Sequence, residues 1–320
     1  MRRFVIQLLF VLLLGPALAA QVTVTATAAR KILLLSDTQS PMWIETLLLP
    51  KHENDKARDM ILTAVASDSA VSAVVHLGDI TESASDESAW KVFERFAEAL
   101  QARRIPLYPA IGNHEYMLNA ARAARLVRAH FPWLDPTWYS TRIGGVALVI
   151  LNSNRGELPR EQWDVQETWY RNTLEQLDRD STVAVIIVGC HHPPYTNSTV
   201  VDPSKDVQRA FVPPYLRSRK ARLFVSGHAH ASEHFVRSGK NFLVLGGGGG
   251  LLQPLLTGSN ARWKDLFPFA LERRFFHYVE CIPEAGALVV RVRMLKRNFS
   301  SIGAPYWFRI PYQAEGASAR

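Results

Sequence analysis

The stretch VSAVVHLGDITE, residues 71–82, decides the fold class of this 320-residue chain. Its first seven residues are largely apolar and have the length of a buried strand. The strand passes directly into Gly78 and Asp79, so that an acidic side chain follows its carboxyl end. In an open α/β sheet the loops that leave the carboxyl ends of the strands converge on a common crevice. We therefore expect Asp79 to lie in a functional crevice at the edge of a sheet.

Four other segments repeat this arrangement of an apolar strand followed by Asp, Asn or His. They are Ser36-Asp37-Thr38-Gln39, Gly112-Asn113-His114-Glu115, His191-His192-Pro193-Pro194 and Gly227-His228-Ala229-His230. Each segment alone is weak, because a single Asp often caps a helix and a single His is often an ordinary polar residue. Together they bring carboxylate, amide and imidazole groups to one place, and these groups suit hard to borderline metal ions. Unpaired carboxylates gathered there would repel each other, so a cation is the natural compensation.

The remaining patterns predict strands and helices around this centre. Helical spacing of apolar residues indicates helices over 86–103 and 162–177. Further apolar runs predict strands at 32–35, 105–110, 146–151, 183–188, 223–226, 242–245, 276–281 and 288–294. Strand–helix alternation followed by closely spaced strands predicts an α/β sandwich with helices outside it, in a single domain over 21–320. The glycine run 246–250 is either a flexible turn or a place where the backbone passes close to a ligand.

The amino terminus has the pattern of a secretory signal peptide over residues 1–20. Arg2 and Arg3 precede an apolar run, which ends in small residues around Ala19. The run is short for a membrane span, although an uncleaved anchor is the alternative reading. We expect cleavage near Ala19 or Ala20, export to the periplasm or the medium, and no stable membrane insertion afterwards.

Charge and cysteine content leave two further questions open. The formal net charge of +8 favours anionic substrates or surfaces, but it also fits an ordinary basic protein, and no dense run of Lys or Arg indicates nucleic-acid binding. Cys190 and Cys281 are the only cysteines. They form one disulfide in an oxidising compartment, or Cys190 is a buried thiol in its strand.

In order and spacing, the five segments resemble the motifs of the calcineurin-like metallophosphoesterase superfamily: D-x-H, G-D-x-x, G-N-H-[DE], H-x-P and G-H-x-H. Four of the five match at their key positions, and they span the chain from Asp37 to His230. The resemblance implies a four-layer sandwich in which two mixed β-sheets pack face to face with helices outside. In this fold the strands from about residue 270 onward would complete the second sheet.

The resemblance also implies two metal ions, both divalent or one trivalent and one divalent, such as Mn, Fe or Zn. Asp79 would bridge them and so take part in catalysis. The other ligands would be Asp37, Gln39 and His230 for the first metal, and Asn113, His191 and His228 for the second. His192 is the alternative to His191, which the H-x-P spacing favours.

Two residues of the third motif have implied roles beside the metals. His114 would not ligate; it would act as a general acid or charge stabiliser near the leaving group. Glu115 would orient it. The one departure from the motifs is Gln39, which stands where the family has His. Its amide oxygen is a weaker ligand than an imidazole nitrogen, so Gln39 either binds the first metal weakly or only hydrogen-bonds a metal-bound water.

The function implied is hydrolysis of a phosphate mono- or diester by a metal-bridging hydroxide. The partner would be a small phosphate ester, and no feature indicates a nucleic-acid or protein partner. Two other functions remain: a metal- or phosphate-binding protein with weakened catalysis, which Gln39 favours, and a nuclease with the same chemistry, which a salt-sensitive affinity for DNA would support.

Overall fold

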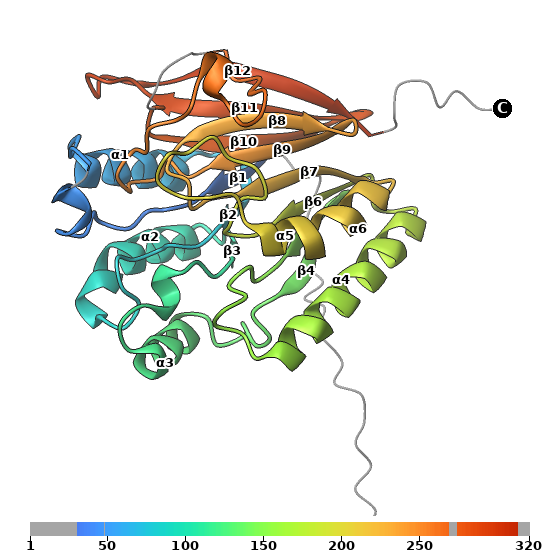
Figure 1. Ribbon diagram of the computed structural model, residues 1–320, viewed down its shortest axis with the longest axis horizontal. Helices are drawn as coiled ribbons and strands as arrows, with labels where there is room; N and C mark the ends of the chain where they lie inside the picture. The colour runs from blue at the N-terminus through green and yellow to red at the C-terminus, as the bar shows by residue number, and fades with distance from the viewer. Residues whose placement is uncertain (1–30, 48, 269–273, 313–320) are drawn as a thin grey trace, which may run out of the picture.

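The computed structural model describes residues 31–47, 49–268 and 274–312 (Figure 1). The expected signal peptide lies outside these ranges. Within them, no helix combines the length and the apolar character needed to cross a membrane.

The first of two six-stranded sheets has the strand order β12-β11-β10-β1-β2-β3. Its strands are β1 (Lys31–Leu35), β2 (Val71–His76), β3 (Leu107–Pro109), β10 (His277–Glu284), β11 (Ala287–Leu295) and β12 (Ile302–Pro311). β1, β2 and β3 are parallel, whereas β10 runs antiparallel to β1 and continues into antiparallel β11 and β12. The carboxyl-terminal strands therefore extend the sheet that contains the amino-terminal β1.

The second sheet has the order β4-β5-β6-β7-β9-β8. Its strands are β4 (Tyr139–Ile143), β5 (Val146–Ile150), β6 (Val185–Gly189), β7 (Ala221–Ser226), β8 (Ser232–Arg237) and β9 (Lys240–Leu245). β5, β6, β7 and β9 are parallel, and the two outer strands β4 and β8 are antiparallel to their neighbours. Both sheets are thus mixed, as expected.

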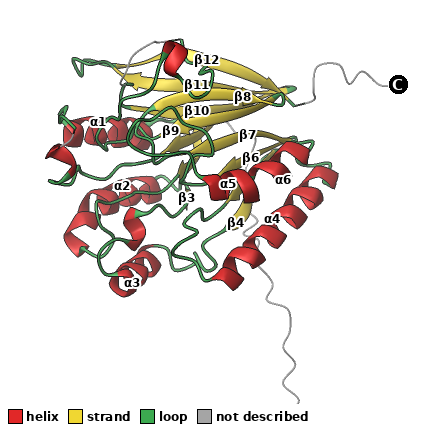
Figure 2. Cartoon of the chain, viewed as in Figure 1, coloured by secondary structure: helices red, strands yellow, loops and turns green. Residues whose placement is uncertain are grey.

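Helices cover the outer face of each sheet, which completes the four layers (Figures 1 and 2). The helices are α1 (Asn54–Ser67), α2 (Lys91–Ala102), α3 (Ala120–His130), α4 (Arg160–Arg179), α5 (Lys205–Ala210) and α6 (Val212–Arg217). Residues of α1–α3 pack with the first sheet, and residues of α4–α6 pack with the second. The predicted four-layer sandwich is confirmed.

The central strands β1, β5 and β6 are nearly continuous apolar runs because both of their faces are buried. In β1, Ile32 and Leu34 face the core between the two sheets, while Leu33 and Leu35 pack with the residues of the helices on the other face. Since successive side chains of a strand point to opposite faces, each strand needs apolar residues at every position. Burying a Leu or Ile side chain contributes about 1.5–3 kcal/mol.

The structure also corrects two details. The predicted helix over 86–103 begins with a 3₁₀ turn, Glu87–Trp90, capped by the Asp86 side chain, and becomes α-helical only at Lys91. Cys190 and Cys281 are both free thiols, buried in different core clusters. The disulfide alternative is therefore wrong in this structure, and the buried-thiol alternative holds.

Candidate metal centre

All five motifs follow parallel strands at one edge of the two sheets. Asp37 follows β1, Asp79 follows β2, Asn113 follows β3, His191 follows β6 and His228 follows β7. The loops are joined by backbone hydrogen bonds, including Asp37 N to Gly78 O at 3.0 Å and Gly227 N to His191 O at 2.9 Å. Segments far apart in the sequence are therefore held together by the sheet geometry.

One group of donor atoms surrounds His191 Nε2. This nitrogen lies 3.2 Å from Asp79 Oδ2, 3.0 Å from Asn113 Oδ1 and 3.2 Å from His228 Nδ1. These four residues are the bridging ligand and the three ligands predicted for the second metal. Asp79 and His191 are fully buried, whereas Asn113 and His228 are half-buried, so the centre opens to solvent on their side.

A second group lies beside it and contains the residues predicted for the first metal. His230 Nε2 is 3.4 Å from Asp37 Oδ1 and 3.2 Å from Gln39 Nε2. Donor atoms of Asp37, Asp79 and His191 all lie within 4.8 Å of one another, which joins the two groups. The structure thus brings every predicted ligand into one site.

The histidine rings are oriented by backbone carbonyls. His191 Nδ1 donates to Leu77 O at 2.9 Å, and His230 Nδ1 donates to Leu251 O at 2.8 Å. Nε2 is therefore the ring nitrogen that faces the neighbouring carboxylates. Burial acts to lower the pKa of His191, but the Asp79 carboxylate outweighs it and raises that pKa to about 9, so a bound metal would displace a proton from Nε2. This orientation of the rings is one sign that the donors fit metal ions.

The electrostatics of the centre are those of tightly coupled ion pairs. Burial acts to raise the pKa of Asp79, but His191 and His114 outweigh it and hold that pKa well below its usual value. Burial lowers the pKa of His228 well below its usual range, and the adjacent His192 and His191 lower it further. Asp79 is therefore ionised and His228 neutral, which are the protonation states that metal binding requires.

Gln39 lies in the ligand group, buried, with its amide beside His230. Its Oε1 has no hydrogen-bond partner among the described residues. A buried oxygen without a partner costs about 1–3 kcal/mol, so a cation at this position would relieve an existing penalty. This orphaned acceptor is a second sign that the donors fit a metal.

His114 lies at the edge of the centre. Its Nε2 is 3.7 Å from Asp79 Oδ2, and its Nδ1 donates to the carbonyl of Glu82 at 2.7 Å. The backbone carbonyl of Glu82 therefore orients the His114 ring. A backbone carbonyl is present in every residue, so no side-chain motif could reveal this contact.

Glu115 instead holds two motif loops together. Its carboxylate accepts hydrogen bonds from the backbone N–H groups of Asp79 at 2.9 Å, Ile80 at 2.8 Å and Gly112 at 2.7 Å. It thereby fixes the loop that carries the bridging Asp79 against the loop that carries Asn113 and His114.

His192, the alternative to His191, lies next to the ligand group. Its ring centroid is 4.5 Å from that of His228, and its Nδ1 is 2.9 Å from Ser153 Oγ. Ser153 was missed in the sequence, although Asn152-Ser153-Asn154 follows the strand 146–151 just as the five motifs follow theirs. A polar run directly after an apolar strand is visible in the sequence, and it would have identified Ser153 as a candidate.

The backbone at the centre adopts conformations that ordinary residues avoid. Asp37, Asp79 and His228 have φ values of 58°, 53° and 64°. Gly250 belongs to the glycine run, and a Cβ added there would lie 2.5 Å from the His230 ring. The run therefore passes close to a ligand, which is the second of the two alternatives set out for it.

Comparisons with known proteins agree with this geometry. A family model for calcineurin-like phosphoesterases matches residues 30–232. Similar solved structures include the purple acid phosphatase PPD1 of yellow lupin (Lupinus luteus) seeds, 16% identical, with a TM-score of 0.62 over 88% of this chain and 53% of the lupin chain. They also include GAP50, the anchor in the inner membrane complex of Plasmodium, 13% identical, with a TM-score of 0.64 over 90% of both chains. A dimetal phosphatase from Danio rerio is 14% identical, with a TM-score of 0.54 over 90% of this chain and 100% of its own.

At these identities the solved structures show the fold, and the family model adds the motifs. Fold and convergent ligands together define a hydrolase that acts on phosphoric ester bonds. The chain belongs to the calcineurin-like phosphoesterase family, whose model covers more than half of it. The family implies a centre of two metal ions, and the donor set described above fits that requirement.

Proposed function

We propose that this protein is an exported metal-dependent phosphoesterase that hydrolyses a small phosphate mono- or diester. The observation that carries the proposal is the meeting of His191 Nε2, Asp79 Oδ2, Asn113 Oδ1 and His228 Nδ1, with His191 Nε2 no more than 3.2 Å from each of the other three atoms. Export rests on the Arg2-Arg3 and Ala19 pattern of the amino terminus.

The predicted ligands would form two adjacent metal sites that share Asp79. Asp37, Gln39, Asp79 and His230 would hold the first metal, and Asp79, Asn113, His191 and His228 the second. Bound metals supply Lewis-acid activation of water and neutralise charge on the phosphoryl oxygens. The half-buried side formed by Asn113 and His228 is where a substrate phosphate reaches the centre.

His114 would act as the general acid for the leaving group. Because its Nδ1 donates to the Glu82 carbonyl, Nε2 is the ring nitrogen left to face the centre. His114 would therefore donate a proton from Nε2 to a departing oxygen or stabilise the charge on it.

The test is hydrolysis of p-nitrophenyl phosphate and bis(p-nitrophenyl) phosphate by protein reconstituted with Mn, Fe or Zn. Asp79→Ala should lower kcat/KM by at least about a hundredfold, because it removes a ligand shared by both metals. Asp164→Ala, an exposed position on α4, is the control and should retain full turnover. Turnover by chelated protein or by Asp79→Ala would contradict the proposal.

A binding protein with weakened catalysis is the second candidate, and Gln39 is the observation that favours it. The similar GAP50 is described as an anchor rather than as an enzyme. Metal content measured alongside turnover separates the two functions: stoichiometric metal without hydrolysis of either ester would favour the binding protein.

A further inference from the structure

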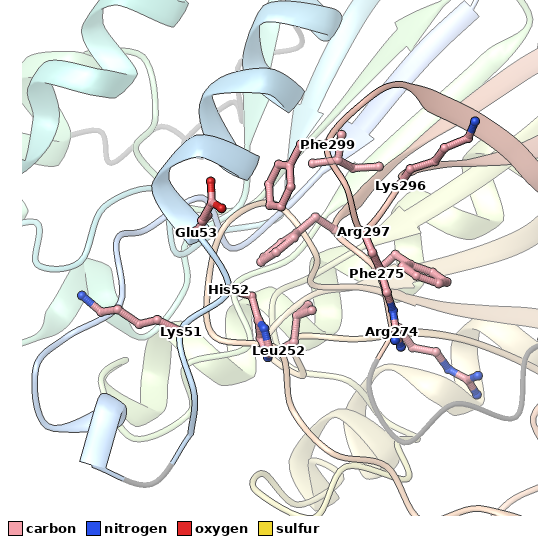
Figure 3. A pocket seen from close by; sticks show the side chains of 11 residues that line it. Lys51, His52, Glu53, Leu252, Arg274, Phe275, Lys296, Arg297 and Phe299 are labelled. Carbon is pink, nitrogen blue, oxygen red and sulfur yellow. The ribbon is translucent and has the colours of Figure 1, made fainter.

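A cavity of about 480 Å³ lies away from the metal centre and has no residue of the ligand set in its lining. It is formed by the segment that leads into α1 on one side and by the end of β11 with the connection to β12 on the other (Figure 3). Leu252, which follows the glycine run, closes it from a third direction. The centre's chemistry does not account for this cavity.

The lining is strongly cationic. Lys51, Lys296 and Arg297 border the cavity and, in the part of the chain that the structure describes, none of them forms an ion pair. The one acidic residue of the lining, Glu53, is engaged with Lys56 at 2.7 Å. The Arg297 side chain lies against Phe275 at the cavity wall, whereas the ammonium groups of Lys51 and Lys296 point outward from its rim (Figure 3). The rim is positively charged and would attract an anion.

A helix amino terminus and a buried arginine also lie at the cavity. Helix α1 begins at the cavity, and its N-cap residue Glu53 makes no side-chain capping hydrogen bond. The first N–H groups of a helix attract anions. Arg274, also part of the lining, is 4% exposed and bonds Asp265 through Nη2 at 2.7 Å, while its Nε and Nη1 have no hydrogen-bond partner among the described residues.

The rest of the lining is apolar and aromatic. Phe275 and Phe299 present rings to the cavity wall, and the Arg297 guanidinium carbon lies 5.3 Å from the centroid of the Phe275 ring. Leu252 and Leu295 are buried beneath. A cationic border over an apolar floor binds a molecule that combines negative charge with an apolar body.

We propose that this cavity is a second binding site, distinct from the metal centre, for an organic anion that joins two or more negative charges to a flat apolar body. The proposal goes beyond the phosphoesterase function and does not depend on it. The ligand is bound there without being hydrolysed, because none of the metal ligands or His114 borders the cavity.

The test uses naphthalene-1,5-disulfonate, which is flat, doubly charged and not a phosphate ester. Its binding to the metal-loaded full chain should be saturable, with one site per chain by isothermal titration calorimetry. Arg297→Glu should weaken it at least about tenfold, because the variant replaces an attractive charge with a repulsive one. Arg291→Glu is the matched control: it lies on β11, exposed and outside the lining, and should change the Kd less than about twofold.

Lys51→Glu, on the opposite side of the cavity, is the second variant, and it should weaken binding as Arg297→Glu does. Neutral 1-naphthalenemethanol has the apolar body without the charge, and inorganic sulfate has the charge without the apolar body. Neither should displace the probe. Affinities of Arg297→Glu and Lys51→Glu equal to that of Arg291→Glu would overturn the proposal. Loss of binding on addition of EDTA would place the probe at the metals and would overturn it as well.

Discussion

The substitution Glu115→Gln tests whether one buried carboxylate holds the metal-binding loops in place. Both oxygens of Glu115 are used: Oε2 accepts from Gly112 N at 2.7 Å and Asp79 N at 2.9 Å, and Oε1 accepts from Ile80 N at 2.8 Å. Glutamine has the same shape, but only one of its terminal atoms is an acceptor. With that oxygen facing Gly112 and Asp79, its NH₂ group faces the N–H of Ile80.

The cost follows from this exchange. One buried N–H loses its acceptor, which costs about 1–3 kcal/mol. Burial and the neighbouring Asp79 raise the pKa of Glu115 to about 7, so removal of the charge offsets part of this cost at neutral pH. We therefore expect the free energy of unfolding to fall by about 1–2 kcal/mol. Metal affinity should fall with it, because Asp79 and Asn113 lie on the two loops that Glu115 joins.

The measurement is urea unfolding of chelated protein at neutral pH, with metal binding by titration calorimetry on the same samples. Glu157→Gln, at an exposed carboxylate with the same change in charge, is the control and should alter stability by less than about 0.5 kcal/mol. A Glu115→Gln protein as stable as this control, with unchanged metal affinity, would refute the role of the carboxylate.

Three further changes probe other parts of the molecule. Gly250→Ala places a methyl group 2.5 Å from the His230 ring and should weaken metal binding, whereas Gly156→Ala, with nothing within 4 Å, should not; equal affinities would refute the packing argument. Gln39→His should raise the metal content that survives dialysis, measured by elemental analysis, and an unchanged content would remove Gln39 from the ligand set. Burial raises the pKa of Glu233 from 4.5 to about 7, so the native state keeps a proton that the unfolded chain loses between these values. The stability of wild type relative to Glu233→Gln should therefore be greatest below pH 4.5 and fall by about 3 kcal/mol as the pH rises past 7, and a difference independent of pH would contradict this.

The parallel strands and the ligands were predictable for the same physical reason. Strands buried on both faces require unbroken apolar runs, and the runs at 32–35, 183–188 and 223–226 stand out from the polar motifs that follow them. Because the carboxyl ends of parallel strands share an edge, the position of a strand also gives the position of its ligand.

Two of the elements that sequence patterns missed, α3 and β12, bury little of their surface. In α3 only Ala123 and Val127 are buried, and Ala and Arg make up most of its sequence, so its apolar face is small. In β12, Gly303 and Pro305 interrupt the pattern, which an edge strand tolerates because it pairs on one side only. The roles of the Glu82 and Leu251 carbonyls depend on backbone atoms, which every residue carries, and no side-chain motif can show them.

The left-handed backbone at Asp37, Asp79 and His228 has a consequence for how this protein responds to mutation. Each such residue costs on the order of 1 kcal/mol relative to glycine. The three together therefore lower the free energy of unfolding, which is commonly only about 5–15 kcal/mol, by about 3 kcal/mol. Glycine at any of them would relieve this backbone strain while deleting a predicted metal ligand, but at Asp37 and Asp79 it would also remove the acceptor of a buried backbone N–H. Selection of this protein for heat resistance alone should therefore recover His228→Gly, which would be more stable and inactive at once.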